Sequence, residues 1–354
     1  MQECIRDNWV SSAGPHVTQL EQRMAALTGR RFAVATVNGT SAIHLALLAL
    51  GVKSGQRVIV PDWTFAATAN AVGHAAAEPI FVDVTEQSWS LDPELLDRVL
   101  RERNDIAAVI AVDVLGHPAD LDPIMKVCRR LGVPLIEDAA GAIGASYRGR
   151  PCGGLGDVGI FSFNGNKTVT AGGGGMLVTD NELVAQRARS LSTQARPGRD
   201  YIHDAIGFNY RMTNLNAALG LAQLERLDEM VAAKRAIAAR YDAALAGCND
   251  IRPMPRCEWA ESSCWLYSVK LSDKAAAAAL VHCCEADAIE ARVFWYSLSA
   301  QTPWSDAERH LTGISGSLSG TVVSLPCSSH LTKEHQVRVI QALTRANAEP
   351  GAAP

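Results

Sequence analysis

Long apolar runs and clusters of basic residues are both missing from this sequence of 354 residues. No stretch approaches the roughly 18 consecutive apolar residues that a membrane-spanning helix requires. The N-terminal segment MQECIRDNWV also lacks the apolar centre of a signal peptide. The formal net charge of −4, without a basic run, argues against nucleic acid as the main partner. We therefore expect a cytoplasmic protein that binds neither a membrane nor nucleic acid.

Cysteine is present, but the spacings typical of metal and redox sites are not. The nine cysteines include no CxxC pair and no familiar Cys/His ligand spacing. A chain of this length also needs no disulfide to stabilise it. We expect reduced cysteines that mostly fill the core, and no bound metal.

The order of apolar patterns predicts an α/β fold in two domains. The chain is longer than one ordinary core requires, so we predict a large domain at residues 1–235 and a smaller one at residues 236–350. One long amphipathic helix, from Leu215 to Leu245, is expected to bridge them. Alternating strands and helices with short connections favour a mainly parallel sheet. The main predicted strands are 32–37, 57–61, 80–84, 106–114, 133–137 and 158–163, and the main predicted helices are 15–28, 42–50, 93–103, 121–132 and 182–193. The end, 348–354, is expected to be a frayed tail.

One lysine stands between two apolar strands in the stretch 156–179, GDVGIFSFNGNKTVTAGGGGMLVT. Removing an ammonium group from water is costly unless the group has a chemical task. The four glycines at 172–175 leave no side chains to crowd whatever lies beside Lys167. We therefore hypothesise that Lys167 forms a Schiff base.

A possible phosphate site lies where the strand at 32–37 meets the helix predicted at 42–50. Gly39, Thr40 and Ser41 would present free backbone N–H groups, two hydroxyls and the positive end of a helix dipole. The alternative is an ordinary helix N-cap without a ligand.

Two more candidate residues follow predicted strands. Phe65, with Trp63 as a second choice, comes after the strand at 57–61, where an aromatic ring can stack on a planar ligand. The alternative is that these rings belong to the core. Asp138 follows the strand at 133–137 and is suited to face a ligand beyond the strand ends, although it could also cap a turn.

A glycine pattern in the same region resembles a dinucleotide-binding motif by its letters alone. Gly154, Gly156 and Gly159 match GxGxxG, but a strand rather than a helix is predicted after them. The dinucleotide fingerprint needs a strand before the glycines and a helix after them, so we reject this interpretation.

The ordered motifs resemble a family of enzymes that use pyridoxal 5′-phosphate. The segments WVSSAGPHV, VNGTSAIHLAL, VPDWTFAATANAV, LIEDAAGAIGA, GDVGIFSFNGNKTVTAGGGGMLVTD and GFNYRMTNLNAALG look like nucleotide-sugar aminotransferases of the DegT/DnrJ type, over residues 3–345. The resemblance implies PLP fold type I, with a mostly parallel sheet of the seven-stranded type and a smaller α+β C-terminal domain. It also implies an enzyme that takes an amino group from glutamate.

Within that family, WVSS and SFNGNK–GGGG look most like the C4 aminotransferases of UDP-4-keto-6-deoxy-N-acetylhexosamines, which serve the bacillosamine and legionaminic acid pathways. The resemblance thus implies a role in surface-glycan biosynthesis, such as that of lipopolysaccharide. Three alternatives remain: a GDP-perosamine-type enzyme, a 3-keto-sugar aminotransferase, and a non-catalytic protein that binds pyridoxal phosphate for regulation.

The resemblance also implies roles for individual residues. Lys167 matches the catalytic Schiff-base lysine, and Asp138 matches the aspartate that pairs with the pyridinium nitrogen. Asn209 resembles an asparagine that reaches the phosphate from the neighbouring subunit, which implies a homodimer with shared sites. The other matching positions are Gly39, Thr40, Ser41 and Ser162 for the phosphate, Phe65 for ring stacking, and Trp9, Asn164 and Arg292 for the substrate.

Three features depart from the family pattern. Gly141 stands where relatives often have Gln, Glu or His near the ring oxygen. Ser299 stands where a histidine is expected, in a segment (292–299) that also lacks the usual proline after Arg292. The chain begins close to the first matching motif, whereas relatives usually carry more residues there. The first bears on a hydrogen bond to the cofactor ring, and the other two bear on the substrate side of the site.

Overall fold

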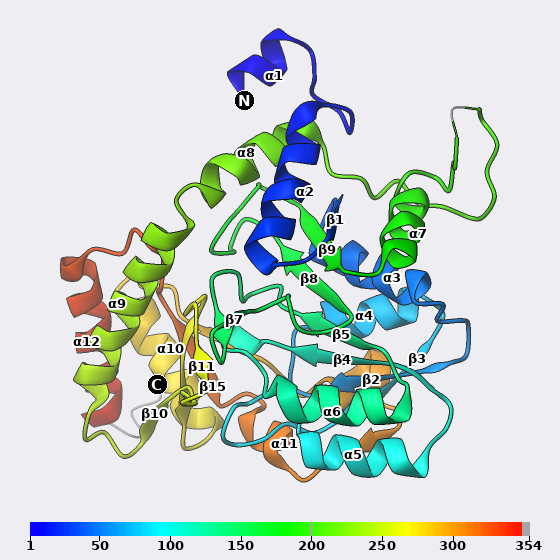
Figure 1. The fold of residues 1–354 in the computed structure, drawn as a ribbon. Coiled ribbons are helices and arrows are strands. Elements are labelled where there is room, and N and C mark those ends of the chain that lie inside the picture. The colour runs from blue at the N-terminus through cyan, green and yellow to red at the C-terminus, as the bar shows by residue number, and fades with distance from the viewer. Residues whose placement is uncertain (199, 349–354) are drawn as a thin grey trace.

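The computed structural model describes residues 1–198 and 200–348 and is organised around an eight-stranded sheet (Figure 1). The strand order is β1-β9-β8-β5-β4-β2-β3-β14, and the neighbouring strands are parallel except where β9 pairs with β1 and β8. The predicted α/β fold is confirmed, and the expected seven strands are joined by a short eighth, β14. The strands are β1 (Phe32–Thr36), β2 (Arg57–Pro61), β3 (Glu78–Val82), β4 (Ile106–Val112), β5 (Leu135–Asp138), β8 (Val158–Ser162), β9 (Gly175–Thr179) and β14 (Arg309–His310).

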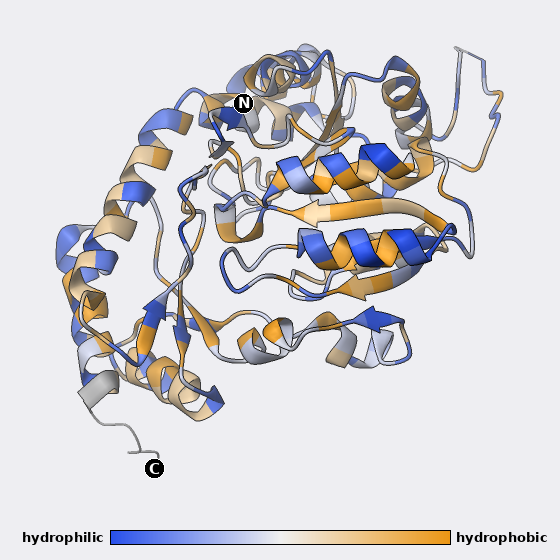
Figure 2. Cartoon of the chain, turned by 60° about the horizontal axis from the view of Figure 1, so that its bottom comes forward, coloured by the Kyte–Doolittle hydropathy of each residue, from blue (hydrophilic) through white to orange (hydrophobic). Residues whose placement is uncertain are grey.

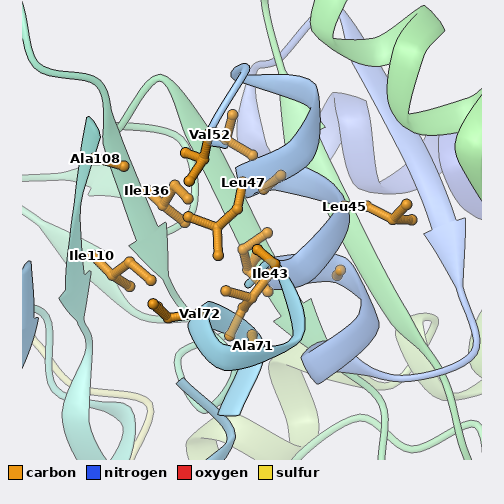
Figure 3. Packing of buried hydrophobic residues seen from close by; sticks show 14 of the residues in the cluster. Ile43, Leu45, Leu47, Val52, Ala71, Val72, Ala108, Ile110 and Ile136 are labelled. Carbon is orange, nitrogen blue, oxygen red and sulfur yellow. The ribbon is translucent and has the colours of Figure 1, made fainter. Parts of the chain in front are cut away.

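Helices cover both faces of this sheet. On one face Ile43 and Leu47 of α3 and Val72 of α4 pack against Ile110 and Ile136 of the central strands (Figure 3). Burial of each such side chain contributes about 1.5–3 kcal/mol. The helices on this face are α3 (Gly39–Ala49), α4 (Ala67–His74) and α7 (Glu182–Ser192), and those on the other face are α2 (Pro15–Thr28), α5 (Pro93–Glu102), α6 (Leu121–Leu131) and α8 (Asn214–Leu224). In Figure 2 the strands of the sheet are mostly orange and the helices in front of them carry blue bands.

Most element boundaries lie within a few residues of the prediction, and one difference matters for the site. The helix predicted from residue 42 begins at Gly39 instead. The reason is Asn38, whose side-chain oxygen accepts the backbone N–H of Ser41 at 2.8 Å and so caps the first turn.

The long helix predicted from Leu215 to Leu245 is wrong in one respect: it is two helices. α8 ends at Leu224, and α9 runs over Leu227–Leu245 after a break at Arg226. The buried positions continue at three- and four-residue spacing across the break, from Ala217, Gly220 and Leu224 to Leu227, Val231 and Lys234. Because the phase of the pattern is preserved, the periodicity does not reveal the interruption.

A second, smaller sheet lies in the C-terminal part of the chain. Its order is β10-β12-β15-β13, all antiparallel, and α9, α10 and α12 supply helical residues to the same core. β14 comes from the same part of the chain but joins the large sheet beside β3. The proposed division at residue 235 remains a prediction. The elements are β10 (Ile251–Pro253), β12 (Tyr267–Leu271), β13 (Arg292–Val293), β15 (Val322–Leu325), α10 (Lys274–Ala286) and α12 (Lys333–Ala348).

The remaining elements are short. A three-stranded sheet of order β11-β6-β7 lies beside the large one. Within residues 1–198 and 200–348, no helix has both the length and the apolar content needed to cross a bilayer. Apart from Ala348, the predicted tail at 348–354 falls outside the described residues. The short elements are α1 (Gln2–Arg6), β6 (Ser146–Tyr147), β7 (Arg150–Pro151), β11 (Ala260–Glu261) and α11 (Ile314–Leu318).

A buried carboxylate joins the end of β3 to the segment that follows β14. Asp83 is fully buried, and one oxygen accepts the N–H groups of Thr312 (2.7 Å), Gly313 (2.8 Å) and Ile314 (3.1 Å). The other oxygen accepts the N–H of Ser315 at 2.8 Å. Burial opposes ionisation, yet these hydrogen bonds outweigh it and lower the pKa of Asp83.

We predict that Asp83→Asn lowers the free energy of unfolding by about 3 kcal/mol, because an amide group would face N–H donors inside the protein. Urea denaturation measures this loss, with the exposed Asp250→Asn as the matched control. The Asp83 carboxylate stabilises the fold fully at pH values above its ordinary, unfolded-state pKa. This stabilisation is lost as the pH falls through the lower pKa that Asp83 has in the folded protein. The gap between the wild type and Asp83→Asn should therefore narrow in acid; a constant gap would contradict the assignment.

Candidate active site

A cavity of about 460 Å³ lies beyond the carboxyl ends of the central strands, next to the start of α3. A second cavity, of about 610 Å³, adjoins it on the side of the small sheet. The two share Asn166, Lys167, Trp265, Arg292 and Phe294. Eight predicted site residues line the smaller cavity: Gly39, Thr40, Phe65, Asp138, Ser162, Asn164, Lys167 and Arg292.

Lys167 lies in the loop between β8 and β9, at the junction of the two cavities. Its backbone N–H donates to the carbonyl of Asn164 at 3.0 Å, which closes a tight turn. Its Nζ lies 3.4 Å from the centre of the Trp265 ring. Burial lowers the pKa of Lys167 to about 7, although the charge of Asp138 partly opposes this shift. A substantial fraction of the amine is therefore neutral near physiological pH.

Asp138, the last residue of β5, is buried at the wall of the smaller cavity. It accepts the hydroxyl of Thr68 at 2.9 Å and the N–H of Ala140 at 3.2 Å, so both of these donors are neutral. Burial raises the pKa of Asp138, against the opposing effects of Thr68, Ala140 and Lys167. A carboxyl in this setting is stabilised in its charged form by a cationic ligand atom.

The start of α3 forms an anion cradle. Because Asn38 takes the N–H of Ser41, the groups left for a ligand in the first turn are the N–H of Gly39 and of Thr40. A Cβ on Gly39 would lie 3.0 Å from the Cβ of Ser162, so glycine leaves this space open. The positive end of the helix dipole adds to the attraction for an anion.

Three predicted residues lie outside this lining. Ser41 is buried and its N–H is already bonded, whereas Trp9 is 52% exposed near α1 and Asn209 is exposed after α7. Their predicted roles remain predictions.

The two aromatic candidates behave differently. Phe65 is 59% exposed and lines the cavity. Trp63 is buried among Trp89 and Trp295, and its indole N–H donates to the carbonyl of Trp295 at 3.1 Å. For Trp63, the interpretation as a core residue is therefore the correct one.

The sequence of the whole chain matches one family of enzymes. Residues 1–344 match the model of the DegT/DnrJ/EryC1/StrS aminotransferase family. The chain belongs to this family. It is a sugar aminotransferase that depends on pyridoxal phosphate. The smaller cavity fits this cofactor, because it offers an anion cradle beside Gly39, a buried carboxyl and a partly neutral amine.

Individual relatives support the assignment. The chain is 40% identical to the putative pyridoxal phosphate-dependent aminotransferase EpsN of Bacillus subtilis, over 96% of this chain and 90% of that protein. It is 37% identical to the GDP-perosamine synthase of Caulobacter vibrioides, over 96% and 92%. The crystal structure of a DegT DnrJ EryC1 StrS aminotransferase from Brucella abortus superimposes with a TM-score of 0.92 at 28% identity, over 98% and 94%.

Two positions that depart from the family pattern have clear environments. Ser299 is buried, and its N–H donates to Asp62 at 2.8 Å, while Ser297 also bonds to this carboxylate. Ser299 therefore holds its segment against the end of β2 rather than facing the cavity. Gly141 lies beneath the Trp265 ring, which occupies the space of a side chain at that position.

Thr68 and Trp265 are among the residues of the site that were not predicted. Thr68 is the second residue of α4, and its backbone N–H donates to the carbonyl of Phe65 at 3.2 Å in the turn that precedes the helix. Its place at the start of the helix that follows Phe65 was a usable signal. Trp265 lies two residues before β12, which begins at Tyr267, and nothing in the local sequence distinguishes it from a core residue.

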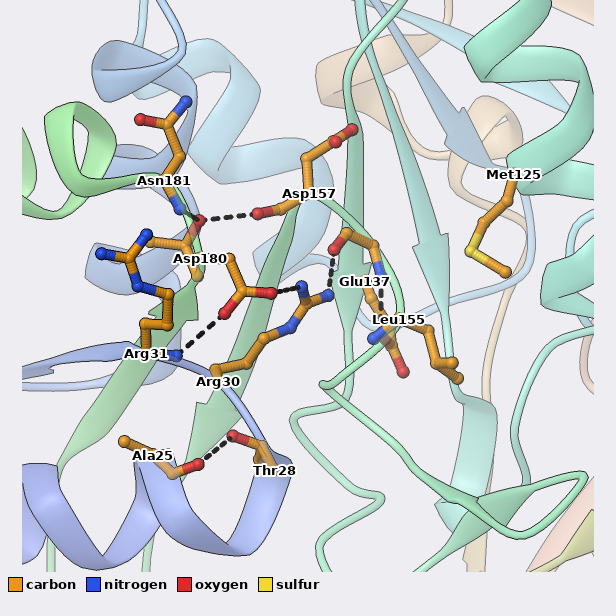
Figure 4. Close-up of polar contacts among 12 residues, drawn as sticks. Ala25, Thr28, Arg30, Arg31, Met125, Glu137, Leu155, Asp157, Asp180 and Asn181 are labelled. Carbon is orange, nitrogen blue, oxygen red and sulfur yellow. Dashed lines mark hydrogen bonds and ion pairs between the residues drawn. The ribbon is translucent and has the colours of Figure 1, made fainter.

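The glycine pattern at 154–159 has a structural role. Glu137, which faces away from Asp138, accepts the N–H groups of Leu155 (2.8 Å) and Gly156 (3.0 Å), and that of Gly153 (Figure 4). The loop leads into β8 and not into a helix. Its N–H groups therefore bind a carboxylate of the protein itself. Glu137, Asp113 and Cys152 also offer possible metal-ligand atoms within 4.8 Å of one another, but both oxygens of Glu137 are already bonded.

The arrangement can hold and move one proton. Bound pyridoxal phosphate supplies an electrophilic carbon for amines and a ring that takes up the electrons of a breaking C–H bond. The neutral amine of Lys167 can then take a proton from the carbon of an amino donor and later return it to a carbon of the acceptor. Asp138, if ionised, stabilises positive charge in the cavity.

We predict that acetylation of Lys167 in the cofactor-free protein reaches half of its maximal rate at a pH of about 7, because only the neutral amine reacts. Pulse labelling with acetic anhydride and peptide mass spectrometry measures this rate. Nα-acetyl-lysine, whose side-chain amine is free and exposed to water, is the reference. A midpoint near 10 would show that the amine is not desolvated.

Proposed function

We propose that this enzyme transfers the amino group of glutamate to the C4 keto group of a nucleotide-linked 4-keto-6-deoxy sugar. The first candidate substrate is a UDP-4-keto-6-deoxy-N-acetylhexosamine. The products are 2-oxoglutarate and the 4-amino sugar. The observation that carries the proposal is the position of Lys167, a partly neutral amine that lines both the smaller cavity with Asp138 and the larger one.

In this proposal the smaller cavity holds the cofactor. Lys167 binds its aldehyde carbon, Asp138 its ring nitrogen, and the N–H groups of Gly39 and Thr40 with Ser162 its phosphate. Phe65 lies against the ring. The burial of Lys167 and Asp138 and the free N–H groups of Gly39 and Thr40 support these roles.

The larger cavity is proposed to take the nucleotide sugar. Arg292 belongs to both cavities, and His330 lines the larger one. A guanidinium group attracts diphosphates. Asn164, which lines the smaller cavity, is proposed to contact the sugar.

A GDP-linked sugar is the second candidate substrate. Its support is the 36–41% identity to proteins named GDP-perosamine synthase from three bacteria. The short motifs WVSS and SFNGNK favour the UDP-linked sugar, so the two candidates require a direct comparison.

The test is an assay of the purified enzyme with glutamate and each of the two 4-keto nucleotide sugars. We expect 2-oxoglutarate and a product with the mass of the 4-amino sugar from the UDP-linked substrate. Lys167→Ala should abolish turnover and the visible absorption of the lysine-bound cofactor. Faster turnover of the GDP-linked sugar would show that it is the better substrate of the two. No turnover with either sugar would refute both substrate proposals.

We further propose that the enzyme is a homodimer whose subunits share their sites. Asn209 does not line the cavity of its own chain and is exposed after α7. In this arrangement Asn209 reaches the phosphate in the partner's cavity, and the exposed Trp9 is covered by the dimer.

A mixing experiment tests the sharing. Lys167→Ala and Asn209→Ala are each expected to be nearly inactive as homodimers. When the two variants are unfolded together and refolded, about half of the dimers should be mixed, each with one intact site, so activity should return to about a quarter of the wild-type value. If Asn209 serves its own chain, no mixed dimer has an intact site and activity stays low.

A further inference from the structure

Trp265 separates the two cavities and lines both of them. It is only 6% exposed and comes just before β12 of the small sheet. It is therefore a residue of the C-terminal part of the chain that reaches the lysine loop of the large sheet.

The indole makes three contacts at the site. Its face lies 3.4 Å from the Nζ of Lys167, measured to the ring centre. Its N–H donates to the carbonyl of Asn166, the residue before the lysine, at 2.8 Å. A Cβ on Gly141 would lie 2.9 Å from Cζ3 and closer still to Cε3. The ring and a side chain at position 141 thus exclude each other.

The backbone of Trp265 is also held firmly. Lys234 of α9 donates to the carbonyls of Trp265 (3.1 Å) and Cys327 (2.6 Å). A Cβ on Gly116 would lie 2.7 Å from the Trp265 nitrogen, so that loop approaches the backbone closely. The backbone position from which the ring reaches the lysine is therefore fixed.

We propose that Trp265 is a positioning residue for Lys167. Its ring covers the lysine amine, and its N–H holds the lysine loop. The ring occupies space that only glycine at position 141 leaves open. The inference rests on the role proposed for Lys167, but not on the identity of the sugar.

The ring acts on the amine in two opposing ways. It excludes water, which favours the neutral form, and its electron-rich face attracts the cation. Burial, to which the ring contributes, lowers the pKa of Lys167 to about 7, and we take the exclusion of water as the larger of the two effects of the ring. The titratable and charged side chains that line the cavities beside the amine are Asp138 on β5 and, in the larger cavity, Arg292, Glu290, Lys234 and His330. Without the ring, water from the larger cavity reaches the amine and its pKa rises.

The first test measures Lys167 acetylation in the cofactor-free, full-length protein at pH 7. If Trp265→Ala raises the pKa of Lys167 by one unit or more, the neutral fraction falls from about half to below about a tenth, and labelling slows at least about fivefold. A ring that only walls off the amine predicts the reverse, faster labelling in the more open site. Unchanged or faster labelling overturns the proposal.

Two variants keep the test independent of misfolding. Trp265→Phe retains a ring face but loses the N–H bond to Asn166, so its labelling midpoint should stay near pH 7 while turnover falls. Trp259 is a partly buried tryptophan next to Tyr147 that lines neither cavity. Trp259→Phe should therefore change neither the labelling midpoint nor the turnover. In the loaded enzyme, the rising limb of the kcat–pH profile should move up by about one unit in Trp265→Ala only. A midpoint shift in Trp265→Phe as large as that in Trp265→Ala refutes the role of the ring face.

The pairing with Gly141 gives the final test. Gly141→Ala should displace the ring and slow labelling in the wild-type background. In the Trp265→Ala background the added methyl group meets no ring, so its further effect should be less than about twofold. Fully additive effects would show that Gly141 does not serve the ring. No turnover with any sugar, together with the expected labelling changes, would count against the proposed function and leave this inference intact.

Discussion

The site depends on keeping one amine out of water. An ammonium group is stable in solvent and costly inside a protein, so the fold must supply reasons for Lys167 to stay where it is. Those reasons come from three parts of the chain: the turn between β8 and β9, the carboxyl of Asp138 on β5, and the indole of Trp265 before β12. Each restrains the amine differently, by geometry, by charge and by exclusion of water.

Much of this was predictable from the sequence. The strands and helices of the large sheet follow from apolar periodicity, and Lys167 and Asp138 stood out as charged residues beside buried strands. Their meeting in one cavity follows because carboxyl ends of parallel strands lie on one edge. The break between α8 and α9 was not predictable, because the buried positions keep their phase through it. Trp265 was not predictable either, since its contacts join residues about a hundred positions apart.

The two residues that depart from the family pattern can be interpreted only from their surroundings in the structure. Gly141 and Ser299 look like lost functions in the sequence. In the structure, the first is matched by a ring that fills its place, and the second by a carboxylate that binds its backbone. The absence of a side chain at Gly141 and the bulky ring of Trp265 belong together, because the ring fills the space that a side chain at position 141 would occupy. Comparison of aligned columns one at a time cannot detect such a pair.

The contact between Asp83 and the turn after β14 also bears on biosynthesis. The two partners, Asp83 and Thr312, are separated by 229 residues, and β14 completes an edge of the sheet that is otherwise built by residue 179. During translation, the edge strand β3 emerges long before the segment that will cover it. Until then its unpaired backbone is an exposed edge of the kind that pairs with other chains. The part of this edge that β14 covers, at Phe81 and Val82, is therefore closed only after residues 309–310 have been synthesised.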